Sequence, residues 1–243
     1  TAGVRVGALG VLNTDWGDGG HHNLLGCSWY GYAYGAQEGW APARTADEDF
    51  ERGFARLHFG PEEGDDALTA LRALGEACTL PGIIRRNGSL SMELLFTDPT
   101  ANMQCASIST QALTRMLELA EQAIAALVDL DGWGVADEAA RAEARRTLAE
   151  FRLSAALVRH AARRGLLGRQ FAAAATDGQR RALYPTLQAM KRELHDLRAE
   201  YRRIWLARNR PEGLWLTLDK FDRSAQVLDS WREQTAPVYA FGL

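Results

Sequence analysis

An apolar segment at residues 4–12 is the feature that most constrains the fold of this chain. Its side chains are mostly aliphatic or β-branched, and no charged residue lies between Arg5 and Asp15. Such a composition is typical of a strand that is buried on both faces of a sheet. The segment ends in a polar run with three glycines, Asn13-Thr-Asp-Trp-Gly-Asp-Gly-Gly20. Because α/β barrels carry their sites at the carboxyl ends of their strands, we expect polar chemistry at this point.

A helix rich in aromatic residues is predicted directly after this run, at residues 27–40. We expect most of its rings to pack in the core, although Tyr30 and Tyr34 share one helical face that would suit a cleft. One strand and one helix cannot bury their apolar faces alone. We therefore expect the strand either to complete a larger barrel or to pair with a strand elsewhere.

The remainder of the chain has the apolar periodicity of helices. The first is expected to run from an N-cap at Thr45 to Phe59. Residues 80–107 lack this period and contain several prolines and glycines, which predicts a long loop with an extended piece at 90–96. Further helices are predicted from position 109 or 110 to a break at 131–134, and over residues 137–164, 179–207 and 218–234.

The helix predicted at residues 179–207 has a continuous apolar seam. Its members alternate by four and three positions: Leu183, Leu187, Met190, Leu194, Leu197, Tyr201 and Ile204. This spacing is typical of a helical bundle or a coiled coil. It would close a bundle within one chain or join two copies in a homodimer, and the pattern does not choose between them.

The composition, 47% hydrophobic and 24% charged, is that of a soluble globular protein. A formal net charge of −3 gives no reason to expect nucleic acid or an anionic membrane surface as a partner. No apolar run approaches the roughly 20 residues that a membrane span needs. The three cysteines lack metal-ligand spacing, which predicts free thiols and favours the cytoplasm. The chain begins at Thr1 rather than methionine, so we expect a truncated start.

Two stretches resemble family 20 glycoside hydrolases. Gly7-Ala-Leu-Gly-Val-Leu-Asn-Thr-Asp-Trp-Gly-Asp18, followed by Gly20-His-His and Ser28-Trp-Tyr-Gly-Tyr-Ala-Tyr-Gly-Ala-Gln-Glu-Gly-Trp40, is similar to their final barrel strand and helix. The closer similarity is to bacterial β-N-acetylhexosaminidases that carry a helical domain after the barrel. The end of that domain resembles the segment Tyr201-Arg-Arg-Ile-Trp-Leu-Ala-Arg-Asn-Arg-Pro-Glu-Gly-Leu214. The rest of the helical region is similar only in its general helical pattern.

The resemblance implies that the run after the strand contacts a sugar. Trp16 would pack against the sugar in the −1 subsite and Asp18 would hold its distal hydroxyls, although many relatives have the longer Glu there. The alternative is that Trp16 plugs the barrel mouth and Asp18 caps the next helix. Asp15 is a further candidate contact, and its alternatives are an acid that lies behind the residues touching the sugar or a hydrogen-bond partner within the loop. His21 is expected near the sugar and not on a metal, because adjacent histidines diverge and no third ligand is suitably spaced.

Family 20 enzymes use an Asp-Glu pair at the end of an earlier strand. Its Glu is the general acid, and its Asp orients the substrate's acetamido group, whose oxygen is the nucleophile. This chain contains Asp47-Glu48 and Asp137-Glu138, but both are predicted in the first turn of a helix. We therefore assign no catalytic residue to this chain. The resemblance implies neither a metal nor an organic cofactor.

The sequence as a whole predicts a mainly α chain with two parts. Residues 1–44 would form the last strand, site loop and helix of a (β/α)8 barrel, and residues 45–243 an α-helical bundle domain. The whole enzyme would remove terminal β-linked N-acetylglucosamine or N-acetylgalactosamine from a glycan with retention of configuration. A second interpretation is a helical scaffold or oligomerisation module without activity. A third is a different barrel glycosidase with the same strand-end Trp and acids.

Overall fold

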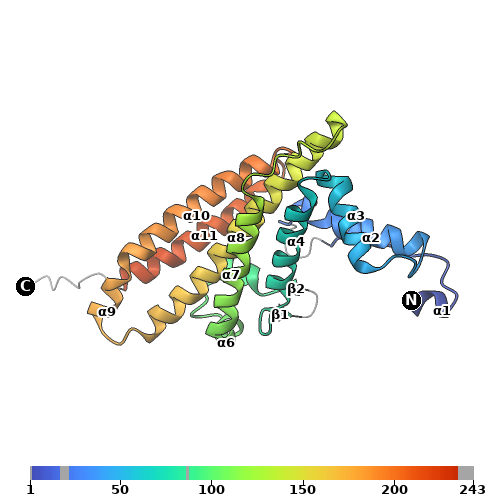
Figure 1. Ribbon diagram of the computed structural model, residues 1–243. Coiled ribbons are helices and arrows are strands. Elements are labelled where there is room, and N and C mark those ends of the chain that lie inside the picture. The colour runs from blue at the N-terminus through green and yellow to red at the C-terminus, as the bar shows by residue number, and fades with distance from the viewer. Residues whose placement is uncertain (1, 17–21, 86–87, 235–243) are drawn as a thin grey trace, which may run out of the picture. The chain divides into compact units, whose positions relative to one another are not determined.

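The structure is a computed structural model that describes residues 2–16, 22–85 and 88–234, and it is mainly helical (Figure 1). Its elements in chain order are α1 (Ala2–Arg5), η1 (Leu25–Ser28), α2 (Trp29–Trp40), α3 (Asp47–Phe59), α4 (Gly64–Thr79), β1 (Ile84–Arg85), β2 (Gly88–Ser89), α5 (Ser91–Phe96), α6 (Met103–Ser107), α7 (Thr110–Leu127), α8 (Glu138–Ala173), α9 (Asp177–Ala182), α10 (Tyr184–Trp205) and α11 (Leu214–Glu233). The predicted mainly α class is confirmed. No helix within the described ranges has both the length and the apolar character that crossing a membrane requires.

The chain divides into two compact units. The first comprises Thr1–Arg72 and Ala123–Arg152, and the second comprises Ala73–Gln122 and Leu153–Leu243. The predicted division at residues 44 and 45 concerns membership of a barrel, and it stays a prediction.

The strand predicted at residues 4–12 does not form. Ala2–Arg5 is a short helix, and residues 8–16 have no regular secondary structure. The side chains of Val6, Leu9 and Leu12 are 81%, 107% and 87% exposed. A strand needs a neighbour that pairs its backbone N–H and C=O groups. Among the described residues β1 and β2 pair with each other, and no strand lies beside residues 4–12.

The start of α3 differs from the prediction at its cap. Ala46, not Thr45, occupies the N-cap position, and it makes no side-chain hydrogen bond there. The Thr45 hydroxyl instead accepts a hydrogen bond of 2.9 Å from Nε2 of Gln37 on α2. Asp47 and its two acidic neighbours lie in the first turn of α3, where negative charge interacts favourably with the helix dipole.

The core of the first unit is formed by side chains of α3, α4, α7 and α8. The rings of Phe59 and Phe151 lie 5.8 Å apart between centroids. Gly60 ends α3 with a φ of 94°, and an added Cβ there would lie 2.8 Å from backbone atoms of Gly134. Only glycine fits both the dihedral angle and this close approach. The buried apolar side chains include Ala55, Phe59, Ala67, Leu68, Leu127, Leu148 and Phe151.

The long loop predicted at residues 80–107 is replaced by a hairpin and two short helices. Strands β1 and β2 pair antiparallel, with Ile84 opposite Ser89. The piece predicted as extended is α5, and its side chains Leu94 and Leu95 are buried. A helix of six residues is too short for an apolar period to appear in the sequence. Its carbonyl groups are satisfied instead by a tertiary contact with Arg164.

Helix α8 continues through Gly165 and Gly168, beyond the predicted end at residue 164. It ends at Ala173 rather than Arg164 and is 36 residues long. An added Cβ at Gly165 would lie 2.9 Å from Cδ2 of Leu113, and one at Gly168 would lie 3.2 Å from the Trp231 ring. These glycines therefore serve close packing against neighbouring side chains, which outweighs their low helix propensity.

The helix predicted at residues 179–207 is divided at Leu183 into α9 and α10. Pro185 lies in the first turn of α10 and has no N–H to continue a helix from α9. From Leu187 to Ile204 the predicted seam is confirmed, since all six of these members are buried.

Helices α10 and α11 lie side by side in Figure 1, and the Tyr201 and Phe221 rings are 5.5 Å apart. The seam thus packs within the chain. The last helix begins at Leu214, earlier than predicted.

Candidate functional site

The residues after the apolar segment lie along a glycine face of α2. Nδ2 of Asn13 donates a hydrogen bond of 2.8 Å to the carbonyl oxygen of Gly31. An added Cβ at Gly35 would lie 2.5 Å from Nδ2 of Asn13, and one at Gly39 would lie 2.9 Å from Cγ1 of Val11. Gly35 and Gly39, one turn apart on α2, thus let the preceding segment approach the helix axis closely.

This segment runs antiparallel to α2. Val11 lies near Gly39, at the C-terminal end of the helix, whereas Asn13 lies near Gly31 and Gly35, closer to its start. The chain therefore reaches the first turn of α2 at Asn13–Trp16. An antiparallel packing of this kind is how a strand and the helix that follows it lie in a β-α unit.

Asp15 is held by the residue that precedes α2. Its Oδ2 accepts a hydrogen bond of 2.5 Å from Oγ of Ser28. Ser28 occupies the N-cap position of α2, yet its side chain makes no capping hydrogen bond to the helix. Its hydroxyl therefore serves Asp15 rather than the backbone of α2, which fixes one oxygen of a half-buried carboxylate and leaves the other available for contacts.

Trp16 presents an exposed indole. Its side chain is 76% exposed, and its Nε1 donates a hydrogen bond of 2.8 Å to Oγ1 of Thr14. Because most of the side chain is exposed, the ring can stack against an apolar or C–H surface. The predicted contacts Asp18 and His21 lie outside the described residues. The structure therefore brings together Asp15 and Trp16, with Asn13 and Thr14 supporting them.

Two carboxylates of α8 hold the loop before α2. Glu150 is buried, and its Oε2 accepts the backbone N–H of Gly26. An added Cβ at Gly26 would collide with this carboxylate and would lie 3.1 Å from Cγ2 of Thr147. Oε1 of Glu143 accepts a hydrogen bond of 2.9 Å from the indole Nε1 of Trp29. The backbone N–H of Gly26 and the indole N–H of Trp29, on either side of Ser28, are thus held by carboxylates of α8.

Tyr30 and Tyr34 of α2 pack against aromatic side chains of α3. Their rings are stacked with centroids 6.3 Å apart, and both meet the edge of Phe50. The Tyr30 hydroxyl donates to Glu51 at 3.3 Å. Burial, reinforced by Glu51, raises the pKa of Tyr30 to about 12, so this phenol remains protonated at neutral pH. These two rings pack against α3 but are only half-buried, and no residue of α2 is fully buried, so the expectation that most rings of this helix lie in the core is not met.

The two Asp-Glu dipeptides lie at helix starts, as predicted. Asp47 is in the first turn of α3, where it accepts a hydrogen bond of 3.1 Å from the Tyr34 hydroxyl. Oδ1 of Asp137 accepts the backbone N–H of Ala140 at 2.8 Å and so caps α8. Within the described ranges, no group of three or more His, Cys, Asp or Glu side chains is arranged to hold a metal ion.

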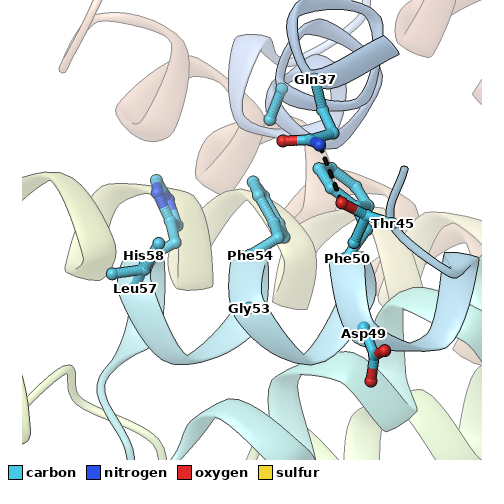
Figure 2. A pocket seen from close by; sticks show the side chains of 9 residues that line it. Gln37, Thr45, Asp49, Phe50, Gly53, Phe54, Leu57 and His58 are labelled. Carbon is cyan, nitrogen blue, oxygen red and sulfur yellow. Dashed lines mark hydrogen bonds between the residues drawn. The ribbon is translucent and has the colours of Figure 1, made fainter. Parts of the chain in front are cut away.

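A hollow of about 420 Å³ lies beside α3 in the first unit (Figure 2). Figure 2 shows Phe50, Phe54 and His58 in a row on α3, with Gln37 of α2 above them. The amide of Gln37 is bonded to Thr45, and Asp49 is paired with Arg52 at 2.5 Å. Since these polar groups are engaged with one another, the hollow offers mainly an apolar ring surface. Its lining comprises Ala33, Gln37, Thr45, Asp49, Phe50, Gly53, Phe54, Leu57 and His58.

The second unit contains a hollow of about 470 Å³ that includes Cys105. Burial, together with the nearby Glu93, raises the pKa of the Cys105 thiol to about 11. A thiol of this kind is protonated at neutral pH and is a poor nucleophile. Arg169 lines the same hollow, but its Nη2 donates to the carbonyl oxygen of Ala106 at 3.2 Å. The burial of Cys105 and the hydrogen bond of Arg169 are therefore explained by the packing of the fold, without a binding or catalytic role.

The buried polar side chains Arg164 and His160 of the second unit make hydrogen bonds that join its helices. Nη1 of Arg164 donates to the carbonyl oxygens of Leu94, Leu95 and Thr97, at the C-terminal end of α5. Nδ1 of His160 lies 3.2 Å from Oε2 of Glu193, which connects α8 with α10. Both Arg164 and His160 are fully buried. These contacts hold helices together and are not directed at an open site.

Sequence reasoning did not identify Ser28, Glu143 or Glu150 as parts of the site. Ser28 precedes a helix, a position for which capping is a sufficient explanation. Both glutamates lie on α8, far from Asp15 in the sequence, and only the fold brings them to the loop at Gly26. Comparison of the chain with protein-family models, curated proteins and solved structures finds no match in any of the three.

Proposed function

We propose that this chain is the C-terminal part of a retaining, substrate-assisted β-N-acetylhexosaminidase similar to family 20. The whole enzyme would remove terminal β-linked N-acetylglucosamine or N-acetylgalactosamine from a glycan. In this proposal residues 1–44 complete a (β/α)8 barrel and residues 45–243 form an appended helical bundle domain. The catalytic Asp-Glu pair comes from a part of the barrel that precedes these residues, and the chain itself supplies part of the sugar-binding wall.

The observation that carries the proposal is the packing of residues 11–16 on α2. The segment lies antiparallel to the helix on glycines, which is the packing of a β-α unit. Its apolar side chains nevertheless face solvent, with Leu9 107% and Leu12 87% exposed. A segment with this composition and a helix already against one side is suited to pairing with neighbouring strands of a barrel. The sequence resemblance over residues 7–40 supports the same assignment.

The sugar-binding wall would be built from the end of this segment. The exposed faces of Trp16 would stack on the C–H face of the sugar ring, and Asp18 would accept hydrogen bonds from its distal hydroxyls. Asp15, with one oxygen bonded to Ser28, and His21 would complete the polar contacts. The chemistry proposed needs no metal and no organic cofactor, because the acetamido oxygen of the substrate is the nucleophile.

The proposal extends to location and assembly. The three cysteines of the chain are free thiols, which is compatible with the proposed cytoplasmic location. They are Cys27, Cys78 and Cys105. A homodimer would have to use surfaces other than the seam of α10, since the side chains of that seam from Leu187 to Ile204 are buried within the chain.

The test is to read the coding frame upstream of Thr1 and to assay the protein that it encodes. We expect a preceding barrel with an Asp-Glu pair at the end of a strand, and hydrolysis of 4-nitrophenyl N-acetyl-β-glucosaminide. A thiazoline mimic of the acetamido intermediate should inhibit the reaction. The 243 residues alone should be inactive, and Asp47→Asn should leave the activity of the whole enzyme unchanged.

Two outcomes would overturn the proposal. An intact protein without hydrolase activity would favour the helical scaffold or oligomerisation module. Hydrolysis that the thiazoline does not inhibit would indicate a barrel glycosidase with a different mechanism, because the mimic binds only where the acetamido group takes part in the reaction.

A further inference from the structure

A connected series of contacts leads from α8 to the sugar-binding wall, and it consists of two hydrogen bonds joined by the backbone of one short helical turn. Its first member is the buried carboxylate of Glu150, which is 1% exposed and accepts the N–H of Gly26. Burying a carboxylate is unfavourable unless strong donors compensate, so this contact is specific rather than incidental. Glycine at position 26 is required by the approach, since a Cβ there would meet both Glu150 and Thr147.

The next member is the short helix η1, which begins at Leu25 and ends at Ser28. Gly26 and Ser28 lie in this single turn, so fixing the backbone at position 26 also fixes the Cα–Cβ direction at position 28. Trp29, the first residue of α2, is held from the same side through its bond to Glu143. Glu143 and Glu150 are seven positions apart, which places them on one face of α8.

The last member is the hydrogen bond of 2.5 Å from Ser28 to Asp15. A serine that donates to an ionised carboxylate makes a charge-assisted bond, which is stronger and more directional than one between neutral groups. Asp15 immediately precedes Trp16. Holding one Asp15 oxygen therefore limits the orientations of both proposed sugar contacts.

We propose that Glu150 and Ser28 are positioning residues that orient Asp15 and Trp16 for the sugar, so that the helical part of the chain helps to build the binding wall. This inference rests on the proposed function for the identity of the ligand. It assigns a role to α8, which neither the sequence pattern nor the resemblance connects with the site. Neither positioning residue is proposed to touch the sugar or the reacting atoms.

The enzymatic test uses the intact protein and 4-nitrophenyl N-acetyl-β-glucosaminide. Ser28→Ala should raise KM about tenfold with kcat within about twofold, because a contact away from the reacting centre contributes mainly to uniform binding. Ser28→Thr, which keeps the hydroxyl, should restore KM to within about threefold of the original value. Glu150→Ala should behave as Ser28→Ala does, whereas Glu150→Gln keeps an acceptor for Gly26 and should be milder. Ser107→Ala, at an exposed position, serves as the control.

A structural test separates this inference from the proposed function. The protein would be labelled with 5-fluorotryptophan, and the ¹⁹F signals of Trp16 and Trp29 assigned through Trp→Phe variants. Ser28→Ala should move the Trp16 signal and leave that of Trp29 in place, whereas Glu150→Ala should move both. If the intact protein hydrolyses nothing but these shifts occur, the proposed function fails while the positioning role stands. If Ser28→Ala changes neither the Trp16 signal nor KM, the positioning role is overturned.

Discussion

The side-chain amide of Asn13 lies so close to Gly35 that a Cβ at position 35 would be 2.5 Å from its Nδ2. The same amide donates to the carbonyl oxygen of Gly31, one turn earlier in α2. The approach of the two segments therefore depends on the absence of a side chain at position 35 but not on its absence at position 31, where a Cβ would meet no atom within 4 Å.

This difference predicts opposite results for the same substitution at two positions of one helix. Gly31→Ala should increase the free energy of unfolding by about 0.5–1 kcal/mol, because alanine has the higher helix propensity. Gly35→Ala should lose this gain, since displacing Asn13 breaks a hydrogen bond worth about 0.5–1.5 kcal/mol. Urea unfolding followed by circular dichroism would measure both. Equal stabilisation by the two variants would show that Asn13 does not pack on α2.

The pair His160 and Glu193 predicts how stability changes with pH. Burial lowers the pKa of His160 below 6.5, against the opposing effect of Glu193. The hydrogen bond with His160 lowers the pKa of Glu193 to about 2, against the effect of burial and with help from Arg163 and Arg159. At neutral pH we therefore expect an uncharged His160 whose Nδ1–H donates to an ionised Glu193. The Nε2 atom of His160 has no hydrogen-bond partner among the described residues.

Both shifts destabilise the folded protein in acid. Below pH 6.5 the unfolded chain binds a proton at His160 more readily than the folded chain does, so stability falls with pH, at most by about 1.4 kcal/mol per pH unit. Between pH 4.5 and about 2 the same holds for Glu193. His160→Gln should remove the first part of this dependence and keep a donor for Glu193. His195→Gln, at an exposed position of α10, should leave the whole profile unchanged. A profile unaltered by His160→Gln would contradict the assignment.

Replacing the buried, charged Arg164 is expected to lower the free energy of unfolding strongly. Its Nη1 donates to three carbonyl oxygens at the end of α5, and burial lowers its pKa to about 10, so it remains protonated at neutral pH. Arg164→Met should cost about 3–5 kcal/mol, because it leaves buried carbonyl groups without a donor. Arg163→Met, on the neighbouring exposed side chain, should cost about 1 kcal/mol or less. Thermal unfolding would compare the two variants, and equal losses would contradict a capping role for Arg164.

The sequence predicts those elements of this fold whose apolar period is long. Helices α7 and α10 are recognisable, and the seam from Leu187 to Ile204 is buried as expected. Glycines lead to a wrong prediction of a helix end where close packing of neighbouring side chains keeps the helix continuous. Gly165 and Gly168 suggest a break, yet they allow Leu113 and Trp231 to approach a continuous α8. Helix α5 is too short to show a period, and it depends on Arg164, which is distant in the sequence.

The candidate site is predictable in part for a similar reason. The strand-like segment and its polar end are visible in the sequence, and the structure leaves Trp16 at that end exposed. The expected strand is absent from the structure because strand pairing requires neighbours that lie outside residues 4–12. The partners of the loop, Ser28 and Glu150, are invisible to pattern reasoning, since the contacts that reveal them are tertiary.

The most direct test of the account is the substitution Trp16→Ala in the intact protein, with Trp40→Ala as its control. Trp40 lies on the same unit and is 92% exposed, so its truncation should leave kcat/KM for 4-nitrophenyl N-acetyl-β-glucosaminide unchanged. Trp16→Ala should lower kcat/KM by the equivalent of about 2–4 kcal/mol of transition-state stabilisation, the range for truncating a large aromatic side chain in a buried contact. An unchanged kcat/KM for Trp16→Ala would remove this residue from the sugar-binding wall and contradict the account.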